Sequence, residues 1–346
     1  MSWLVPLPIV LPLLGAGTTI LVGRSRRWQR IVSLSVLTAV VASSVALLID
    51  VDRNGPIVAR AGGWIPPMGI TLVADRLSTV TLAAASAALL LVLLNAIGHP
   101  GAERHHVGFQ SVYLVMTAGV AGALLTGDLF NLFVAIEMML TASYVLMTLG
   151  GRVDQVRSGM TYVVISLVAS AFFLVGISFV YASTATVNLA ELAGRLEDVN
   201  PGLRLALAAV FLIVFGIKAG LFPLCFWLPD SYPTAPSPVA AIFAALLTKI
   251  GVYAIIRTQT LLFPEVLPTW LLMTLAGATM VVGVLGAIAQ DDLRRLLSFL
   301  IISSIGFMLV GVGLFTVAGI AAAIMYMINQ VVLKSGLFLA GGLVEQ

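Results

Sequence analysis

Long apolar runs alternate with short polar intervals along almost the whole of this 346-residue chain. A helix needs about 20 apolar residues to cross a bilayer hydrocarbon core of about 30 Å. This length predicts about eleven membrane-spanning helices, near residues 3–23, 31–49, 71–97, 108–126, 129–149, 159–182, 203–227, 236–256, 270–289, 296–316 and 319–343. The pattern therefore predicts an all-α, polytopic membrane protein.

Composition agrees with the pattern. Hydrophobic residues make up 60% of the chain and charged residues 10%, which is far from the balance of soluble globular domains. The net charge of +3 comes from arginines in the polar intervals, so it bears on membrane orientation and gives no sign of nucleic-acid binding. The run at residues 3–23 lacks a charged start and is long enough to span, which favours a first helix over a cleaved signal peptide. The single cysteine, Cys225, allows no internal disulfide.

Arginines and lysines are distributed differently. Nine arginines lie in the first, third, fifth and ninth polar intervals and six in the others, so the positive-inside rule predicts an N-terminus outside the cytoplasm. All three lysines, Lys218, Lys249 and Lys334, fall inside predicted spans. Because lysine loses its proton on burial more readily than arginine, this division places fixed charges in the loops and releasable protons in the membrane.

The stretch FLIVFGIKAGLFPLCFWLPDSYPTAPSPVAAIFAALLTKIGVYAII (residues 211–256) contains two of these lysines. Gly220 and Pro223 follow Lys218 within two helical turns, and proline both removes a backbone donor and clashes with the preceding turn. A helix broken at membrane depth is tolerated only against protein or a water-filled cavity. Such breaks beside ionisable groups mark ion pathways, so we predict a broken helix at an ion pathway, followed by a second helix that carries Lys249.

Glu137 is the only carboxylate deep inside a predicted span. We expect it to face Lys218 across two helices, so that each sets the protonation of the other. The alternative is a lone protonated glutamate that is hydrogen-bonded to a neighbouring helix. Lys249 and Lys334 would extend the line as a proton relay bridged by water, unless they lie near helix ends and snorkel to the interface.

The remaining polar groups predict structural roles. We expect Asp75, Asp128 and Asp230, at span edges, to cap helices or to meet loop arginines. The run QDDLRR at 290–295 predicts a solvated cytoplasmic helix start. Residues 184–202 predict a short amphipathic surface helix, with a linker as the alternative.

No motif in the chain predicts a metal, a cofactor or an enzyme active site. His99, His105 and His106 share one short interval, but no cysteine or group of carboxylates accompanies them. Glycine-rich phosphate loops, nucleophile elbows and haem motifs are absent from the sequence. A weak internal repeat relates residues 127–150 to residues 290–313, and repeated helical units are common in transporters.

Four segments resemble the antiporter-like proton-translocating membrane subunits. They are GDLFNLFVAIE, GIKAGLFPLCFWLPDSYPTAPSPVAAIFAALLTKIGVYA, QDDLRRLLSFLIISSIGFMLVG and NQVVLKSGLFLAGG. That family includes the A and D subunits of Mrp-type multisubunit cation/proton antiporters, antiporter-like subunits of respiratory complex I, and membrane-bound hydrogenase subunits. The lysine–break–WLPD–lysine segment is the most specific, and its wording is most similar to the D subunit of Mrp antiporters.

The resemblance implies roles for individual residues. Glu137 matches the family's essential glutamate, Lys218 the lysine of its broken helix, and Lys249 and Lys334 the lysines that follow on the polar axis. Many complex I relatives have histidines at or near four uncharged positions of this chain: Cys225, Tyr232, Asn329 and Gln330. Histidine titrates near neutral pH and these residues do not, and we place Asp230, Tyr232, Asn329 and Gln330 on a candidate polar path.

The resemblance also implies an architecture. We expect a three-helix segment at 1–107, an antiporter-like five-helix repeat with the broken helix at 108–257, and an incomplete, inverted second repeat at 258–346. Relatives continue for several helices beyond the position of Gln346, so we expect a C-terminally truncated fold. Either the sequence is a fragment, or a partner supplies the missing half-channel.

By this resemblance, the chain is a subunit of a hetero-oligomeric Mrp-type antiporter of the inner (plasma) membrane. It would exchange protons for Na⁺ or another monovalent cation, beside other membrane subunits and lipid. Two alternatives stay open: a redox-driven proton-pumping subunit of a complex I or hydrogenase assembly, and a non-transporting scaffold subunit.

Overall fold

The computed structural model describes residues 2–23, 25–98 and 108–344. Its α-helices are α1 (Leu7–Leu21), α2 (Arg26–Asn54), α3 (Arg76–Gly98), α4 (Phe109–Leu125), α5 (Leu129–Thr148), α6 (Val153–Thr184), α7 (Leu189–Arg195), α8 (Pro201–Ala219), α9 (Trp227–Ser231), α10 (Ser237–Ile242), α11 (Thr248–Arg257), α12 (Thr269–Ile288), α13 (Leu293–Gly313) and α14 (Val317–Val344). Among the described residues, ten helical segments are long and apolar enough to cross a membrane, and the 17-residue α4 is a shorter apolar helix. The predicted all-α, polytopic membrane architecture is therefore confirmed, and α4 is shorter than the span expected at 108–126.

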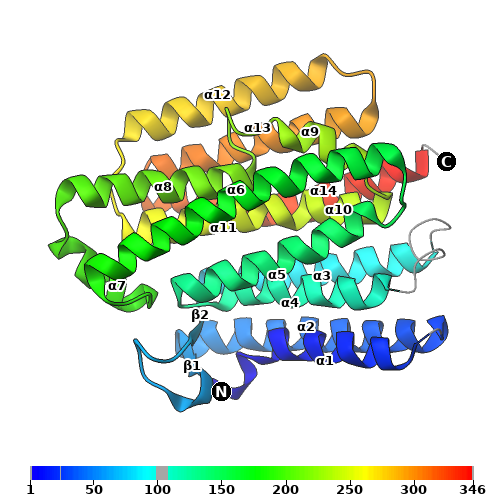
Figure 1. The fold of residues 1–346 in the computed structure, drawn as a ribbon, viewed down its shortest axis with the longest axis horizontal. Coiled ribbons are helices and arrows are strands. Elements are labelled where there is room, and N and C mark those ends of the chain that lie inside the picture. The colour runs from blue at the N-terminus through cyan, green and yellow to red at the C-terminus, as the bar shows by residue number, and fades with distance from the viewer. Residues whose placement is uncertain (1, 24, 99–107, 345–346) are drawn as a thin grey trace.

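The long helices lie side by side in layers (Figure 1). The blue pair α1 and α2 forms one outer layer, packed through α1 on α4 and through α2 on α3. At the opposite edge of the view, α12 packs along α13. The chain ends N and C lie at opposite ends of the bundle, as an odd number of crossings requires.

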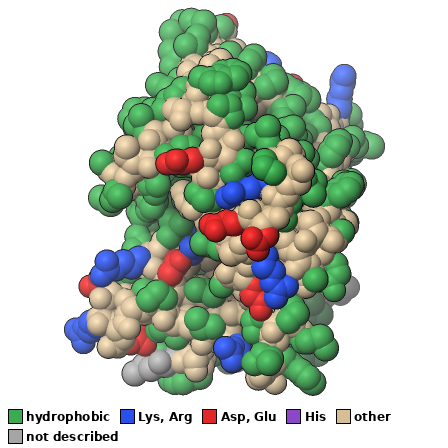
Figure 2. Space-filling view, turned by 90° about the vertical axis from the view of Figure 1, so that its left-hand side faces the viewer, with side chains coloured by type: hydrophobic (Ala, Val, Ile, Leu, Met, Phe, Trp, Pro, Cys, Tyr) green, Lys and Arg blue, Asp and Glu red, His purple; other side chains and the backbone are tan. Residues whose placement is uncertain are grey.

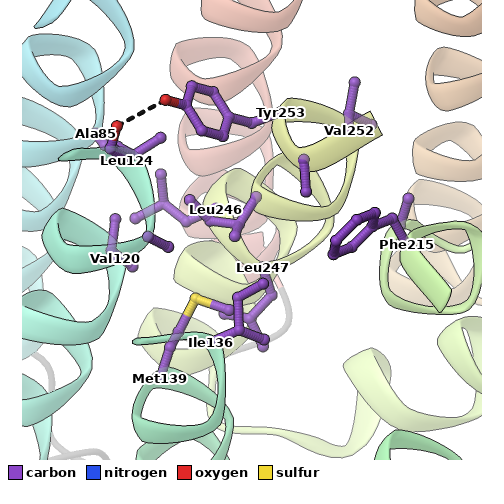
Figure 3. Packing of buried hydrophobic residues seen from close by; sticks show 14 of the residues in the cluster. Ala85, Val120, Leu124, Ile136, Met139, Phe215, Leu246, Leu247, Val252 and Tyr253 are labelled. Carbon is purple, nitrogen blue, oxygen red and sulfur yellow. Dashed lines mark hydrogen bonds between the residues drawn. The ribbon is translucent and has the colours of Figure 1, made fainter. Parts of the chain in front are cut away.

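One span has no outer face. Every residue from 237 to 256 is buried, and this span consists of α10, a π-helical turn at Phe243–Leu247 and α11. An ionisable residue at membrane depth, such as Lys249 in this span, normally faces protein and not lipid. Figure 3 shows Leu246 towards Val120 and Leu124 of α4 and Leu247 beside Ile136 and Met139 of α5, with Phe215 of α8 on the other side of the span.

The predicted break follows Lys218, and two of the carbonyls before it accept hydrogen bonds from residues beyond the helix end. Helix α8 ends at Ala219, where Gly220 adopts a left-handed conformation with φ +85° that a residue with a Cβ rarely adopts. The Leu221 amide donates to the Gly216 carbonyl at 2.8 Å. The Trp227 indole donates to the carbonyl of Ile217 at 3.0 Å. The span expected at 203–227 is therefore shorter than predicted, because Trp227 begins the separate helix α9.

The expectation that residues 71–97 form one helix is wrong at its start. Residues Thr71–Ala74 form strand β2, which pairs antiparallel with β1 (Ile57–Arg60). The strand also bridges to the α4–α5 junction through Leu72 and Thr126. Backbone groups at the end of a span must be paired, and here a hairpin pairs them instead of another helical turn.

An ion pair joins this hairpin to the central span. Asp75, just after β2, meets Arg257 at the end of α11, with Nη1 and Oδ2 2.5 Å apart. Burial alone would raise the pKa of Asp75. The charge of Arg257 and the hydrogen bonds from Arg257 and Ser78 outweigh burial and hold that pKa below its ordinary value. Figure 2 views this end of the molecule, where charged side chains gather among apolar ones.

The other predicted helix ends are confirmed. Asp128 caps α5 by accepting from the Asn131 amide at 2.8 Å, and Asp292 caps α13 by accepting from the Arg295 amide at 2.7 Å. The two segments of the weak repeat thus begin in the same way. Asp230 pairs with Arg295 at 3.1 Å, and the short helix α7 lies within the predicted surface segment.

We predict that Asp75→Asn destabilises the protein, because it leaves the Arg257 guanidinium without its counter-charge. We expect a loss of about 2 kcal/mol in the free energy of unfolding at pH 7. Since the folded pKa of Asp75 is depressed, this contribution is present above the unfolded value of about 3.9 and fades as the pH falls below it. Thermal unfolding of the purified protein at several pH values measures the effect.

The matched control is Asp52→Asn, which removes the same charge from a pair with Arg76 whose side chains are 69% and 75% exposed. Exposed pairs contribute little, so this variant should unfold like the wild type. Equal losses in the two variants would contradict the role assigned to Asp75.

Candidate functional site

A buried ion pair lies where the broken helix meets α5. The Lys218 ammonium, in the last turn of α8, is 3.4 Å from Oε1 of Glu137. The two side chains are only 5% and 23% exposed. The expectation that these residues face each other across two helices agrees with this geometry.

Ser170 of α6 completes the cluster. Its hydroxyl donates to Oε1 of Glu137 and accepts from Lys218 at 3.1 Å. The Ser166 carbonyl is a second acceptor within 2.9 Å of the same hydroxyl. One hydrogen is therefore shared between two acceptors, and the serine can link the acid and the base in either charge state. The sequence contains many serines in spans, so nothing singled out Ser170.

Lys249 lies deep in the central span and is 2% exposed. Its ammonium donates to the carbonyl of Ala244 at 2.5 Å, inside the π-helical turn that precedes it. The hydroxyl of Thr248 is 3.4 Å away. The side chain thus folds back along its own helix, and the alternative of a helix-end lysine that snorkels to the interface does not fit this geometry.

Lys334 of α14 is 4% exposed and lies within electrostatic reach of Lys249. Among the described residues, its ammonium makes no hydrogen bond. One turn earlier, Oε1 of Gln330 is buried and also lacks a partner. Buried polar atoms of this kind are usually satisfied by water, so the surroundings of Lys334 suit a hydrated part of a relay.

Two members of the candidate polar path lie elsewhere. Asn329 is exposed on α14, whereas Gln330 is buried, because consecutive residues of a helix point about 100° apart. The Asp230 side chain is 63% exposed. Asp230 and Asn329 therefore lie apart from the buried lysines, while Tyr232 is fully buried and Gln330 nearly so, and the polar path through these four residues stays a prediction.

The lysine helices approach closely because a glycine separates them. A Cβ on Gly251 of α11 would lie 2.6 Å from the backbone nitrogen of Ala219, the residue after Lys218. Any larger residue would push the two helices apart beside the ion pair. The glycine therefore sets the spacing between the helices of Lys218 and Lys249.

No group of three metal-ligating side chains occurs in the part of the chain that the structure describes. The predicted histidine cluster lies outside the described residues. Cys225 is a free, buried thiol beside the break. The acid, the hydroxyl and the amines of the cluster are groups that can bind and release protons.

The chain belongs to the family of NADH:quinone oxidoreductase/Mrp antiporter transmembrane proteins, which it matches over residues 126–346. It is 44% identical over 350 residues to the D subunit of the Na⁺/H⁺ antiporter of Alkalihalophilus pseudofirmus, a match that covers 100% of this chain and 71% of that protein.

Two solved structures are also similar. A chain of the Mrp complex from Dietzia sp. DQ12-45-1b superimposes with a TM-score of 0.94 at 35% identity, covering 100% of this chain and 65% of that one. A chain of the membrane-bound sulfane sulfur reductase, an archaeal respiratory membrane complex, gives a TM-score of 0.92 at 28% identity, covering 99% and 71%. The sequence thus spans about two thirds of the length of these relatives.

We predict that Gly251→Ala destabilises the protein by about 1–3 kcal/mol, because the added methyl group overpacks the contact with Ala219. Thermal unfolding of the purified protein measures this loss. Gly277→Ala on α12 is the matched control, since a Cβ added at that position would meet nothing within 4 Å. If Gly277→Ala were as destabilising as Gly251→Ala, the close helix contact would not be the cause.

Proposed function

We propose that the chain is a subunit of an Mrp-type multisubunit antiporter in the plasma membrane, where it moves protons in exchange for Na⁺ or another monovalent cation. The observation that carries the proposal is the buried Glu137–Ser170–Lys218 cluster beside a helix break. The similarity to the D subunit of a Na⁺/H⁺ antiporter over the whole of this chain supports the same function. Other membrane subunits would be its partners.

In this proposal Glu137 and Lys218 form the switching pair. An ionised glutamate stabilises the ammonium form of the lysine, and dehydration favours the neutral amine. When a positive charge approaches the pair, the ammonium releases its proton to a neighbouring water and becomes an amine. When that charge leaves, the amine takes up a proton from the other side, and one cycle moves one proton.

Lys249 and Lys334 would pass the proton along the middle of the membrane. Their ammonium groups repel each other, so a proton arriving at one favours release from the other. The gaps require water, because no direct hydrogen bond joins Lys218 to Lys249 or Lys249 to Lys334 among the described residues. Residues 108–257 would form the repeat that holds the switching pair, and residues 258–346 the part that holds Lys334.

A second candidate is a proton-pumping subunit of a redox-driven complex. The similarity to a chain of an archaeal respiratory membrane complex favours it, and the same side chains would serve. The two candidates differ in driving force. Antiport uses a cation gradient alone, whereas a redox-driven pump needs an electron donor.

We predict that Lys218→Ala and Glu137→Gln each lower cation-driven proton movement by about a hundredfold, because each removes one member of the switching pair. The measurement uses everted vesicles that contain the full partner complex, with a Na⁺ pulse and no respiratory substrate. Subunit assembly is checked on the same membranes.

Arg76→Ala is the matched control, because it removes a cation from an exposed pair and should leave exchange unchanged. Proton movement that requires a respiratory substrate and ignores Na⁺ would favour the redox-driven candidate. Full exchange in the Lys218 and Glu137 variants would refute the switching pair and favour a scaffold role.

A further inference from the structure

Hydroxyl groups continue away from the switching pair along one side of α6. Tyr162, Ser166 and Ser170 are spaced four residues apart, so they lie on one helix face. The antiparallel partner α5 places Glu137 opposite Ser170 and Tyr144 near Tyr162. Eight residues of α-helix span about 12 Å, so this face reaches from the switching pair well towards the end of the membrane.

Side chains of α5 and α6 are linked at the far end of this face. The hydroxyls of Ser143 and Tyr162 are 3.0 Å apart. The rings of Tyr144 and Tyr162 meet edge to face, with centroids 5.2 Å apart. The Tyr144 hydroxyl is buried beside Ser166, without a hydrogen bond of standard geometry. Both tyrosines lie within electrostatic reach of Glu137.

Aromatic contacts connect this row of hydroxyl groups to Tyr232, near the end of the bundle. Tyr162 stacks on Trp227 at 5.1 Å, and Trp227 meets Tyr232 edge to face at 5.8 Å. The Tyr232 hydroxyl is buried and has no partner. The next two residues, Pro233 and Thr234, line an open cavity of about 620 Å³ at the end of the bundle, which we call the mouth.

A small internal cavity lies between this series and the lysine. It has a volume of about 10 Å³ and is lined by Tyr162, Ser166, Lys218 and Trp227 with apolar neighbours. Such a volume holds about one water molecule, which needs polar partners to stay. Tyr162, Ser166 and Lys218 carry the hydroxyls and the amine that such a water would need, so we place there one water that joins Tyr162 or Ser166 to Lys218.

We propose that Tyr232, Tyr162, Tyr144, Ser166 and Ser170 form a hydroxyl ladder that conducts protons between the mouth and the Glu137–Lys218 pair. The inference rests on the proposed function and names the route by which protons reach its switching pair from one face of the membrane.

Each hydroxyl in the ladder accepts a proton on a lone pair while it donates its own hydrogen to the next oxygen. A proton that enters from the mouth therefore releases a different proton at the far end. That proton binds the Lys218 amine, which becomes an ammonium, or the Glu137 carboxylate, which becomes a neutral acid. No tyrosine has to ionise, and bound water closes the gaps. After a proton has passed, each O–H group rotates back to its starting orientation.

Packing alone gives a reason for the rings but none for the hydroxyls. A buried hydroxyl without a partner destabilises a fold, and phenylalanine would fill the positions of Tyr144 and Tyr232 with the same ring. Neither hydroxyl has a protein partner of standard geometry, so a place in a water-bridged proton path gives each a role that packing does not.

The test replaces single tyrosines by phenylalanine in the full partner complex. We expect Tyr162→Phe and Tyr144→Phe to lower the maximal rate of Na⁺-driven proton movement in everted vesicles by about tenfold. The Na⁺ concentration for half-maximal rate should not change, because the cation does not use the ladder. Thermal stability of the complex should hold or rise in Tyr144→Phe, which a structural role of the hydroxyl would not allow.

Tyr326→Phe is the matched control, because that ring packs against Phe307, with centroids 4.6 Å apart, on helices outside the ladder. Wild-type rates in both Tyr162→Phe and Tyr144→Phe, with Lys218→Ala inactive, would overturn the ladder and leave the proposed function standing. Wild-type rates in Lys218→Ala as well would overturn the proposed function itself. If Tyr162→Phe does not assemble, Tyr144→Phe and Tyr232→Phe decide the question.

Discussion

The ammonium of Lys218 cannot be left alone inside a membrane, and much of the fold answers that constraint. A charged residue at the bilayer centre costs about 2.5–3.5 kcal/mol even on insertion scales. Glu137 and Ser170 offset this cost with a counter-charge and a hydroxyl. The helix break helps too, because Lys218 lies in the last turn of α8, where the negative end of the helix dipole favours a cation. The ion pair, the hydrogen bond to the serine hydroxyl and the helix end thus all stabilise the Lys218 ammonium.

The second constraint is that the span carrying Lys249 has no lipid-facing side. Its neighbours surround it from residue 237 to residue 256, and Gly251 lets α8 approach within backbone contact. Such packing keeps lipid away from the lysines. The unpartnered Gln330 oxygen one turn before Lys334 marks a place that water would occupy.

Much of this arrangement could be predicted from the sequence, for physical reasons. Apolar runs of membrane length fix the spans, proline and glycine fix the break, and a lone acid among apolar residues has few partners other than Lys218. Ser170 and the hairpin could not be predicted in this way. A serine on an apolar helix has no signal of its own, and Thr71–Ala74 is as apolar as the helix that follows it. The different burial of Asn329 and Gln330 could not be predicted either, because adjacency along a helix does not place two side chains on one face.

The π-helical turn in the central span has a geometric consequence. A π turn holds one residue more than an α turn, so it rotates all that follows on α11 by about 100° relative to α10. The half of the span that begins with Ser237, at the mouth, and the half that holds Lys249, Tyr253 and Arg257 are thus set to different azimuths around one axis. Because of the π turn, one continuous helical span directs its polar side chains to one set of neighbours at one membrane face and to another set at the opposite face.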